Sequence, residues 1–334
     1  MTHVLYLGNF EPTHSTENHV AQALIANGHG LQVMQENDPR TFSVLAGPWP
    51  AALEDVEVIL WTRTGWDWNR FYTGGERRAI ADQRTMLRKA RQAGIPVVGY
   101  HLDIWWGLGR EHLVYDEPFF GVDLLVTADG GHDDKWGVLG INHHWMPPGI
   151  SKAQAKLGKR NPEYVSDIAF VGSWQGGYHR ESAHRYELVE FLQKNFADRC
   201  AFWPKPGQPA VRGKPLQDLY RSVKIAIGDS CFVGSGLANY WSDRIPETLG
   251  RGGLLLHPNV PGLEQYFHDG VDMLTWDAFD WSNLGDMIEA ILSKENDGLR
   301  RQIANQGRAN VLKHHTYEVR MEQLWDLMKN QGLL

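Results

Sequence analysis

The sequence contains only two cysteines, Cys200 and Cys231, among 334 residues. Two cysteines cannot form a disulfide framework in a chain of this length, and the pattern fits a reducing compartment. Because neither belongs to a C-x-x-C pair, zinc-binding and thiol-redox classes have no support. No apolar run approaches the ~18 residues of a membrane span, and the N-terminus lacks the features of a signal peptide. We therefore expect a cytoplasmic protein with no membrane span.

Several catalytic signatures are also missing. No G-x-G-x-x-G follows the first predicted strand, and the nearest approach, residues 234–239, does not follow a strand closely, so a dehydrogenase is disfavoured. No H-E-x-x-H or G-x-S-x-G occurs. The absence of D-x-D argues against sugar transferases that hold a donor diphosphate through a metal ion. We therefore expect neither a metal site nor a cofactor.

The formal net charge is −7. Phosphate contacts made by cationic side chains supply most nucleic-acid affinity, so this charge argues against broad nucleic-acid binding. It leaves room for a local basic groove.

Short apolar runs alternate with amphipathic segments along the chain. Strands are predicted at 4–7, 31–34, 56–61, 95–100, 122–127 and 144–146, and again at 168–171, 201–203, 225–227, 254–257 and 273–276. Amphipathic segments between them predict crossover helices and parallel sheets. The break at 147–162 separates the two series. We expect two Rossmann-like, doubly wound α/β domains, which face each other across a cleft.

Three divisions follow from this pattern. Residues 1–150 are expected to form a first domain and residues 151–315 a second. Residues 316–334 are predicted as a C-terminal helix, with packing back on the N-terminal domain as one option. Ligands of such folds lie beyond the carboxyl ends of the strands, so the loops after strands are searched for chemistry.

In the first half, the loop at 8–18 joins strand to helix, and His14 is its candidate proton acceptor. An ordinary capping loop is an equal alternative. His101 and Asp103 stand two apart at the end of a predicted strand, so their side chains are expected to share one side. A core histidine beside a solvated aspartate is the alternative. Asp129, before two glycines, suggests a tight turn with or without ligand contact.

In the second half, Gly172 and Ser173 leave a strand, and Lys205 leaves the next. A lysine at this place can meet a diphosphate without a metal ion. Arg244 and Glu247 stand three apart at the start of a short predicted helix, so they share a face. They are interpreted as an arginine for phosphate and a glutamate for paired ribose hydroxyls, with a surface ion pair between them as the alternative. Gly252 returns the chain to a strand.

These motifs together resemble a known family. The segment from 170–173 through Arg244-x-x-Glu247 to 252–254, continuing to Gly307, 315–316 and Arg320, is similar to the C-terminal domain of GT-B-type glycosyltransferases. The similarity is to the bacterial and phage group related to spore-maturation-protein-like transferases. The stretches 8–10, 15–19 and 28–29 resemble the N-terminal domains of the same group.

The resemblance implies a UDP- or GDP-type sugar donor held by the C-terminal domain, which makes residues 151–315 the donor domain. It also implies that the acceptor enters from the N-terminal domain, which makes residues 1–150 the acceptor domain. It implies ribose contact by Glu247, diphosphate contact by Arg244 and Lys205, close approach of the 172–173 loop to the phosphates, and a place for Tyr220 near the base. His101 resembles a histidine that contacts the donor sugar. The predicted donor-binding residues are Gly172, Ser173, Lys205, Tyr220, Arg244, Glu247 and Gly252, and the predicted catalytic residues are His14, His101 and Asp103.

One departure concerns stereochemistry. Many retaining members carry a glutamate eight residues before the ribose glutamate, where this sequence has Asn239. If the reaction inverts, Asp103 or His14 is the expected base, and if it retains, neither needs to act as one. The acceptor stays open among a surface glycan, a small metabolite and a hydroxymethylpyrimidine base of phage DNA. A nucleotide-sugar epimerase and a non-catalytic nucleotide-sugar-binding protein are the alternative functions.

Overall fold

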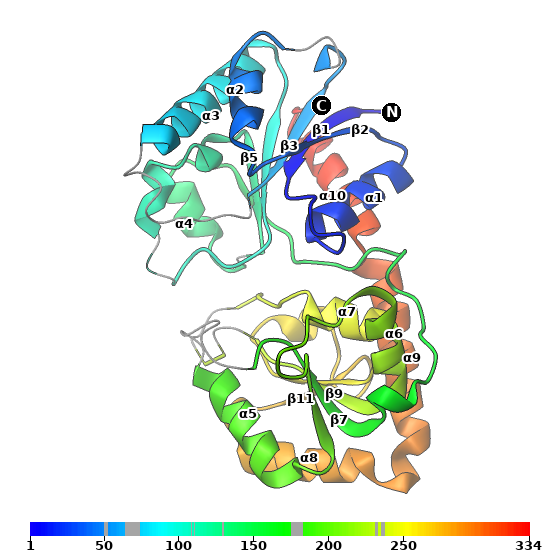
Figure 1. The fold of residues 1–334 in the computed structure, drawn as a ribbon. Coiled ribbons are helices and arrows are strands. Elements are labelled where there is room, and N and C mark those ends of the chain that lie inside the picture. Colours follow the sequence, from blue (N-terminus) through cyan, green and yellow to red (C-terminus); the bar gives the residue numbers. More distant parts are fainter. Residues whose placement is uncertain are drawn as a thin grey trace. The chain divides into compact units, whose positions relative to one another are not determined.

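The computed structural model describes residues 1–49, 53–63, 74–107, 109, 111–128, 130–174, 183–230, 233–234 and 238–334. The chain divides into two compact units. Unit 1 comprises Met1–Pro147 and Arg320–Leu334, and unit 2 comprises Pro148–Val319. Each unit contains one parallel sheet covered by helices (Figure 1). The predicted class of two Rossmann-like α/β domains is therefore confirmed.

The sheet of unit 1 has the strand order β2-β1-β3-β4-β5-β6, with every neighbouring pair parallel. Its strands are β1 (His3–Gly8), β2 (Gly30–Gln35), β3 (Val58–Thr62), β4 (Val97–His101), β5 (Leu124–Thr127) and β6 (His143–Trp145). β3, β4 and β5 are buried along their whole length. Continuous burial is typical of a parallel strand with helices on both faces, and it explains why these segments read as apolar runs.

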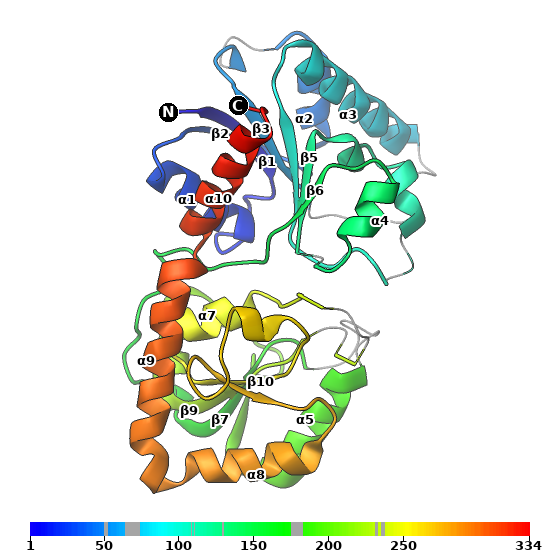
Figure 2. The ribbon, with the colours of Figure 1, turned by 180° about the vertical axis from the view of Figure 1, so that it is seen from behind.

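Helices cover both faces of this sheet. They are α1 (Thr16–Ala26), α2 (Pro39–Ala46), α3 (Gly74–Gln92), α4 (Asp133–Val138) and α10 (Tyr317–Asn330), together with the 3₁₀ helices η2 (Glu111–Tyr115) and η3 (Pro118–Gly121). Figures 1 and 2 show α1 and α10 on one side of the sheet and α2 and α3 on the other. The part of α10 that belongs to unit 1 begins at Arg320.

The boundaries of α1 follow from local chemistry. Ser15 precedes the helix, and its hydroxyl oxygen accepts a hydrogen bond from the Asn18 N–H at 3.2 Å. This satisfies one of the N–H groups that a helix start leaves unpaired. After the helix, Gly28 adopts φ +83°, and the His29 N–H returns to the Leu24 carbonyl at 3.1 Å. The left-handed glycine closes the helix without steric cost.

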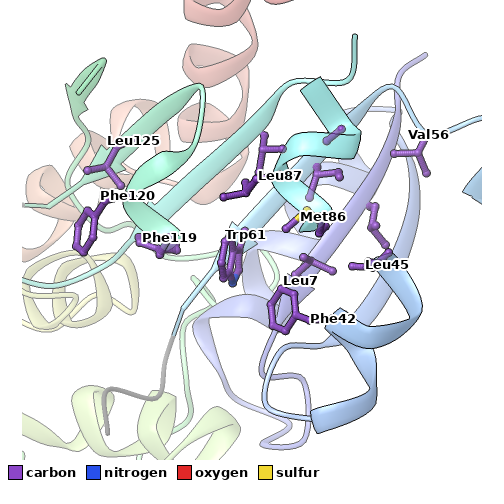
Figure 3. Close-up of a cluster of buried hydrophobic side chains, with 14 of the residues drawn as sticks. Leu7, Phe42, Leu45, Val56, Trp61, Met86, Leu87, Phe119, Phe120 and Leu125 are labelled. Atoms are coloured by element: carbon purple, nitrogen blue, oxygen red, sulfur yellow. The ribbon is translucent and has the colours of Figure 1, made fainter. Parts of the chain in front are cut away.

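The core of unit 1 is centred on Trp61 of β3, between side chains of α2 and η3 (Figure 3). The Trp61 ring lies 5.1 Å from that of Phe42 and 5.2 Å from that of Phe119, measured between centroids. Met86 and Leu87 of α3 close the same cluster. Because this packing fixes the helices along the face of the sheet, the loops at the strand ends stay available for binding.

The sheet of unit 2 has the order β11-β10-β9-β7-β8 and is also parallel throughout. Its strands are β7 (Ser166–Val171), β8 (Cys200–Trp203), β9 (Val223–Ile227), β10 (Leu255–Pro258) and β11 (Leu274–Trp276). Its helices are α5 (Ala183–Phe196), α6 (Gly213–Ser222), α7 (Arg244–Gly250), α8 (Trp281–Leu292) and α9 (Asp297–His314), with 3₁₀ turns η4 (Pro162–Tyr164), η5 (Leu263–Gln265) and η6 (Lys294–Asn296). Ile168 and Phe170 of β7 face the core that α5 and α8 share.

Among the described residues, no helix combines the length and the apolar character that crossing a membrane requires.

Candidate functional site

The strand order of unit 2 places a switch point between β7 and β9. The chain leaves β7 to form β8 on one side and later returns to form β9 on the other. The connections therefore depart in opposite directions, and a crevice opens beyond the carboxyl ends of these two strands. Gly172 and Ser173 follow β7, and Asp229 stands two residues after β9.

The guanidinium group of Arg244 lies at this switch point. Arg244 is the first residue of α7. Its Nε donates to the carbonyl oxygen of Val171 at 3.1 Å, and its Nη1 donates to that of Asp229, also at 3.1 Å. One side chain thus joins the end of β7 to the segment after β9. Its Cζ also lies 5.6 Å from the centroid of the Phe170 ring, which adds a cation–π contact.

Arg244 keeps donors for a ligand. A guanidinium has five N–H groups, and the bonds to Val171 and Asp229 use two of them. The other three have no acceptor among the described residues. Because the group is held by two carbonyls, it is already oriented before an anion arrives, which is what makes a donor effective against developing charge.

Gly172 is brought directly against Arg244. Its φ is +149°, and a Cβ at this position would overlap the Nη2 atom of Arg244. The site therefore requires glycine for both the backbone conformation and the space. Ser173 is exposed beside it. Residues 175–182, which continue this loop, lie outside the described residues, as do Asp129 and residues 235–237.

Lys205 lies on the neighbouring strand end. The Gly172 N–H donates to the Trp203 carbonyl at 2.9 Å, and the Trp174 indole donates to the Pro204 carbonyl at 2.9 Å. These bonds hold the loops after β7 and β8 together. Lys205 is exposed, with its Nζ 4.8 Å from the centroid of the Trp203 ring. The predicted phosphate-binding residues Gly172, Ser173, Lys205 and Arg244 thus share one edge of one sheet.

Glu247 lies one turn into α7. It pairs with Arg251 and not with Arg244, the partner that the sequence suggested. Its Oε1 is 3.5 Å from Nη1 of Arg251, and the same Nη1 donates to the Glu247 carbonyl at 3.0 Å. No ion pair joins Glu247 to Arg244, so the surface-pair alternative does not hold. The Glu247 side chain is 17% exposed, whereas that of Arg251 is 2% exposed. Arg251 therefore supports the carboxylate from the protein side and leaves part of it open to solvent.

Tyr220 is buried in α6 beneath this helix. Burial raises its pKa, and the nearby carboxylate of Glu247 raises that pKa further. Its ring contacts the position where Gly253 would carry a Cβ. The structure thus brings Tyr220 close to Glu247, in the packed layer below the helix.

Gly252 and Asn239 occupy turns. Gly252 has φ +77°, and its N–H donates to the Leu249 carbonyl at 2.8 Å, which closes α7 at the end opposite Arg244. With seven residues at 1.5 Å each, the helix separates Gly252 from the switch point by about 10 Å. Asn239 has φ +57°, and its N–H donates to the Pro261 carbonyl at 2.7 Å.

A buried polar cluster below the switch point was not found by sequence reasoning. The Asp229 carboxylate, fully buried, accepts hydrogen bonds from His184 Nδ1 at 2.8 Å and from Arg185 Nε at 2.6 Å. Burial alone would raise the Asp229 pKa, but the His184 hydrogen bond and the Arg185 charge outweigh it and hold the pKa below its usual value. The position of Asp229 just after a strand was the only signal in the sequence for this cluster. Its partners could not be identified, because they are 44 and 45 residues away along the chain.

His257 lies beside the same cluster. Its Nδ1 is 2.8 Å from the Pro258 carbonyl. Burial lowers the pKa of His257 to about 4. The ring is therefore neutral at pH 7 and adds no positive charge to the cluster beneath Arg244.

The candidates in unit 1 lie beyond the carboxyl ends of its strands. His14 is exposed in the loop after β1. That loop is held by Asn18, whose side-chain amide donates to the carbonyls of Phe10 at 3.0 Å and Pro12 at 2.9 Å. His101 is the last residue of β4. In the sheet β4 is the second strand from β1, so the two strands are about 10 Å apart. The fold thus places His14 and His101 on one edge without joining them.

The expectation that His101 and Asp103 share a strand face was wrong. β4 ends at His101, and Asp103 lies in a bend beyond it. The Asp103 carboxylate accepts a hydrogen bond from the Ile104 N–H at 2.8 Å. Such a local bond turns the backbone away from the extended conformation, so the two-residue alternation stops before Asp103. His101 is 4% exposed and lies 5.8 Å from the Trp105 ring.

Within the described parts of the chain, no group of three or more His, Cys, Asp or Glu side chains is placed to hold a metal ion.

Comparison with solved structures identifies the fold. An alpha-glucosyltransferase in complex with UDP and a 13-mer DNA superposes with a TM-score of 0.68 at 12% identity, covering 98% of this chain and 100% of that one. Anabaena Alr3699/HepE in complex with UDP-glucose gives 0.63 at 10%, covering 99% and 100%. Sucrose-phosphate synthase from Thermosynechococcus elongatus gives 0.60 at 11%, covering 99% and 100%. At these identities the likeness establishes the fold alone, which is GT-B.

The family follows from the sequence itself. A family model described as glycosyl transferase-like matches residues 154–326, more than half of the chain. The protein therefore belongs to the glycosyl transferase-like family and is a glycosyltransferase with the GT-B fold. No curated protein matches the chain.

Proposed function

We propose that this glycosyltransferase moves a sugar from a UDP- or GDP-type donor to a hydroxyl acceptor without a metal ion. In this proposal it belongs to the spore-maturation-protein-like group, whose motif order it shares. The observation that carries the proposal is the Arg244 guanidinium, which is held by the Val171 and Asp229 carbonyls and keeps three N–H groups that have no acceptor among the described residues. The oxygens of a donor diphosphate at the switch point would accept hydrogen bonds from these N–H groups.

The remaining donor contacts are assigned from their positions. Lys205 adds a second positive charge at the same edge, and the 172–173 loop approaches the phosphates with glycine backbone. Glu247, supported by Arg251, accepts hydrogen bonds from two ribose hydroxyls. Tyr220 lies behind Glu247 and fixes the position of the helix rather than stacking on the base.

The chemical step breaks the bond between the anomeric carbon and the diphosphate oxygen and forms one between that carbon and the acceptor oxygen. Negative charge grows on the leaving diphosphate, and Arg244 and Lys205 offset it. The hydroxyl proton passes to Asp103 or His14 if the reaction inverts, or to an oxygen of the departing diphosphate if it retains. His101 is assigned to the donor sugar.

The solved structures suggest the first donor to test. Anabaena Alr3699/HepE was crystallised with UDP-glucose, and the alpha-glucosyltransferase with UDP and DNA. UDP-glucose is therefore the starting donor, with GDP-sugars next. A surface glycan, a small metabolite and DNA containing hydroxymethylpyrimidine are the acceptor panel. Release of UDP with sugar on an acceptor supports the proposal, whereas conversion of the donor alone to an epimer contradicts it.

Glu247 offers a direct test of donor recognition. Glu247→Gln keeps the size of the side chain but removes the charge that two ribose hydroxyls share. We expect the KM for the nucleotide sugar to rise about tenfold, because a hydrogen bond to a charged group contributes about 1.5 kcal/mol or more. The ribose contact is the same in ground and transition states, so kcat should change little. Steady-state kinetics measure both quantities.

Glu264→Gln is the matched control, because Glu264 is exposed in the same unit. It should leave KM unchanged. If both variants behave like the unmodified protein, Glu247 does not hold the ribose.

Metal independence predicts that chelation has no effect. Two fixed cations, Arg244 and Lys205, take the role that a divalent ion has in D-x-D transferases. The transfer rate should therefore stay within about twofold when EDTA is added in excess, as measured by UDP release. A fall to background that added Mg²⁺ or Mn²⁺ restores would contradict the assignment.

A further inference from the structure

A pocket of about 370 Å³ lies in unit 1, away from the strand ends that carry His14 and His101. Its walls come from the second half of α3, from η2 and η3, and from the residues just before β6. α3 leads into β4, η3 leads into β5, and residues 139–141 lead into β6. The pocket therefore lies at the edge of the sheet where these strands begin. Strands of five residues separate it from the carboxyl edge by about 16 Å. Its volume is within the range of small-molecule sites.

Three arginines of α3 line this pocket. Arg84, Arg88 and Arg91 are spaced four and three residues apart, so they share one face of the helix. Arg84 Nη2 donates to the Asp116 carbonyl at 3.0 Å, and Arg91 Nη2 is 3.4 Å from the Asp123 carboxylate. Arg88 is exposed and has no hydrogen bond or ion pair among the described residues. The central arginine of the three is therefore free to receive an anion.

The acidic residues nearby do not cancel this charge. Glu117 lines the pocket, but its carboxylate is 3.1 Å from Nη1 of Arg63, and both side chains are almost completely buried. This pair is neutral overall. Asp116 lines the pocket and Asp123 pairs with Arg91, so three guanidinium groups face two carboxylates. A net positive pocket in a chain of net charge −7 is a local exception.

Apolar side chains also line the pocket. They are Leu87 of α3, which lies among the arginines, and Val114, Phe120, Leu139 and Ile141 from the other segments. Tyr115 stands at the pocket with 77% of its surface exposed. A pocket lined by both guanidinium groups and hydrocarbon matches a ligand that has an anionic end and an apolar body.

We propose that this pocket binds a small organic phosphate, with the phosphate on Arg88 and Arg84 and the apolar part against Leu87 and Phe120. Guanidinium groups match the paired oxygens of a phosphate. The nucleic-acid backbone is the less suitable source of phosphate, because it has no apolar part that could contact the apolar residues of the pocket. Arg77 continues the arginine face of α3 seven residues before Arg84 and lies outside the pocket. The pocket is built by residues of unit 1 alone, whereas Arg244 and its switch point belong to unit 2, so this site is distinct from the proposed donor site.

Calorimetric titration of the full chain with phenyl phosphate tests this inference. Arg88→Gln should weaken binding by about tenfold or more, because one charge-assisted contact is lost. Arg77→Gln is the matched control, since it removes the same charge from the same helix face, and it should leave Kd unchanged. Phenyl phosphate should also bind about tenfold more tightly than inorganic phosphate, because the ring is removed from water.

Three results would overturn the proposal. One is the absence of saturable binding. The second is a Kd that Arg88→Gln does not change. The third is an equal loss in Arg77→Gln and Arg88→Gln together with tight, strongly salt-dependent binding of a single-stranded oligonucleotide, which would assign the whole α3 face to a polyanion. The readout is binding heat, so each result is independent of glycosyl transfer.

Discussion

Replacing Arg244 by alanine is expected to lower kcat/KM for the nucleotide sugar by about 10²- to 10³-fold. In the proposed reaction the side chain supplies N–H groups to the leaving diphosphate, and removing one preorganised donor of this kind has effects of that size. The loss should appear in kcat as well as in donor affinity, because charge on the diphosphate is greatest in the transition state. Single-turnover and steady-state assays separate the two effects.

Arg244→Lys distinguishes charge from geometry. Lysine keeps the positive charge but cannot donate to the Val171 and Asp229 carbonyls and to an anion at the same time, because it lacks the planar fork. We expect it to recover only part of the lost rate. Recovery to the unmodified rate would show that charge alone is required and that the bonds at the ends of β7 and β9 are dispensable.

Arg221→Ala provides the control for both variants. Arg221 is exposed in the last turn of α6 and belongs to the same unit. Its removal changes the net charge equally but leaves the switch point untouched, so the rate should stay within about twofold. If Arg244→Ala and Arg221→Ala have the same small effect, the diphosphate does not bind at the switch point.

The fold could be predicted because its signals are local. Fully buried parallel strands such as β3 and β4 read as apolar runs, and the helices between them have the spacing of amphipathic segments. Two short helices of unit 1 differ in the sequence signal that they carry. α2 carried a usable signal, since Asp38 caps it and Pro39 opens it. α4 has six residues, too few for a periodic pattern.

The candidate site was predictable only where its residues follow strands or begin a helix. Gly172, Lys205 and Arg244 were found for that reason, and parallel pairing then brings their strand ends together. The partner of Glu247 was not found, although Arg251 is only one turn away, because helical spacing allows Arg244 and Arg251 equally. Tertiary packing decides between them: Arg244 reaches across to two strand ends and is therefore unavailable.

Contacts between distant segments could not be predicted at all. The Asp229 carboxylate meets α5 only because β9 lies beside β7 in the sheet, which depends on the complete strand order. Asp103 shows that a local contact can also defeat a prediction from sequence. A single local hydrogen bond to Ile104 ends the extended backbone there and removes the alternation on which the prediction depended.

Asp229 carries the second large expected effect, which is on stability. Asp229→Asn should lower the free energy of unfolding by about 3 kcal/mol, because it leaves Arg185 and His184 without their buried carboxylate. The Arg185 side chain is 9% exposed and that of His184 1% exposed, so water cannot replace the lost partner. Urea denaturation followed by tryptophan fluorescence measures the change.

Asp167→Asn is the matched control in the same sheet. Asp167 also pairs with two cations, Arg199 at 3.0 Å and Lys224 at 2.7 Å, but its side chain is 27% exposed. Solvent screens such pairs, so the expected loss is about 1 kcal/mol or less. Equal losses in the two variants would contradict the special importance of the buried cluster.

The pH dependence of stability gives an independent check on Asp229. Its pKa in the folded protein is held below the usual value despite burial, by the His184 hydrogen bond and the Arg185 charge. A depressed carboxyl pKa stabilises the fold above the unfolded-state pKa of about 3.9, and this contribution is lost as the pH falls through the folded-state value. The unmodified protein should therefore lose stability steeply below about pH 4, and Asp229→Asn should lose it less steeply. Parallel curves for the two proteins would mean that Asp229 does not ionise as the buried partner of Arg185, and the anchoring of the switch point from below would then need another origin.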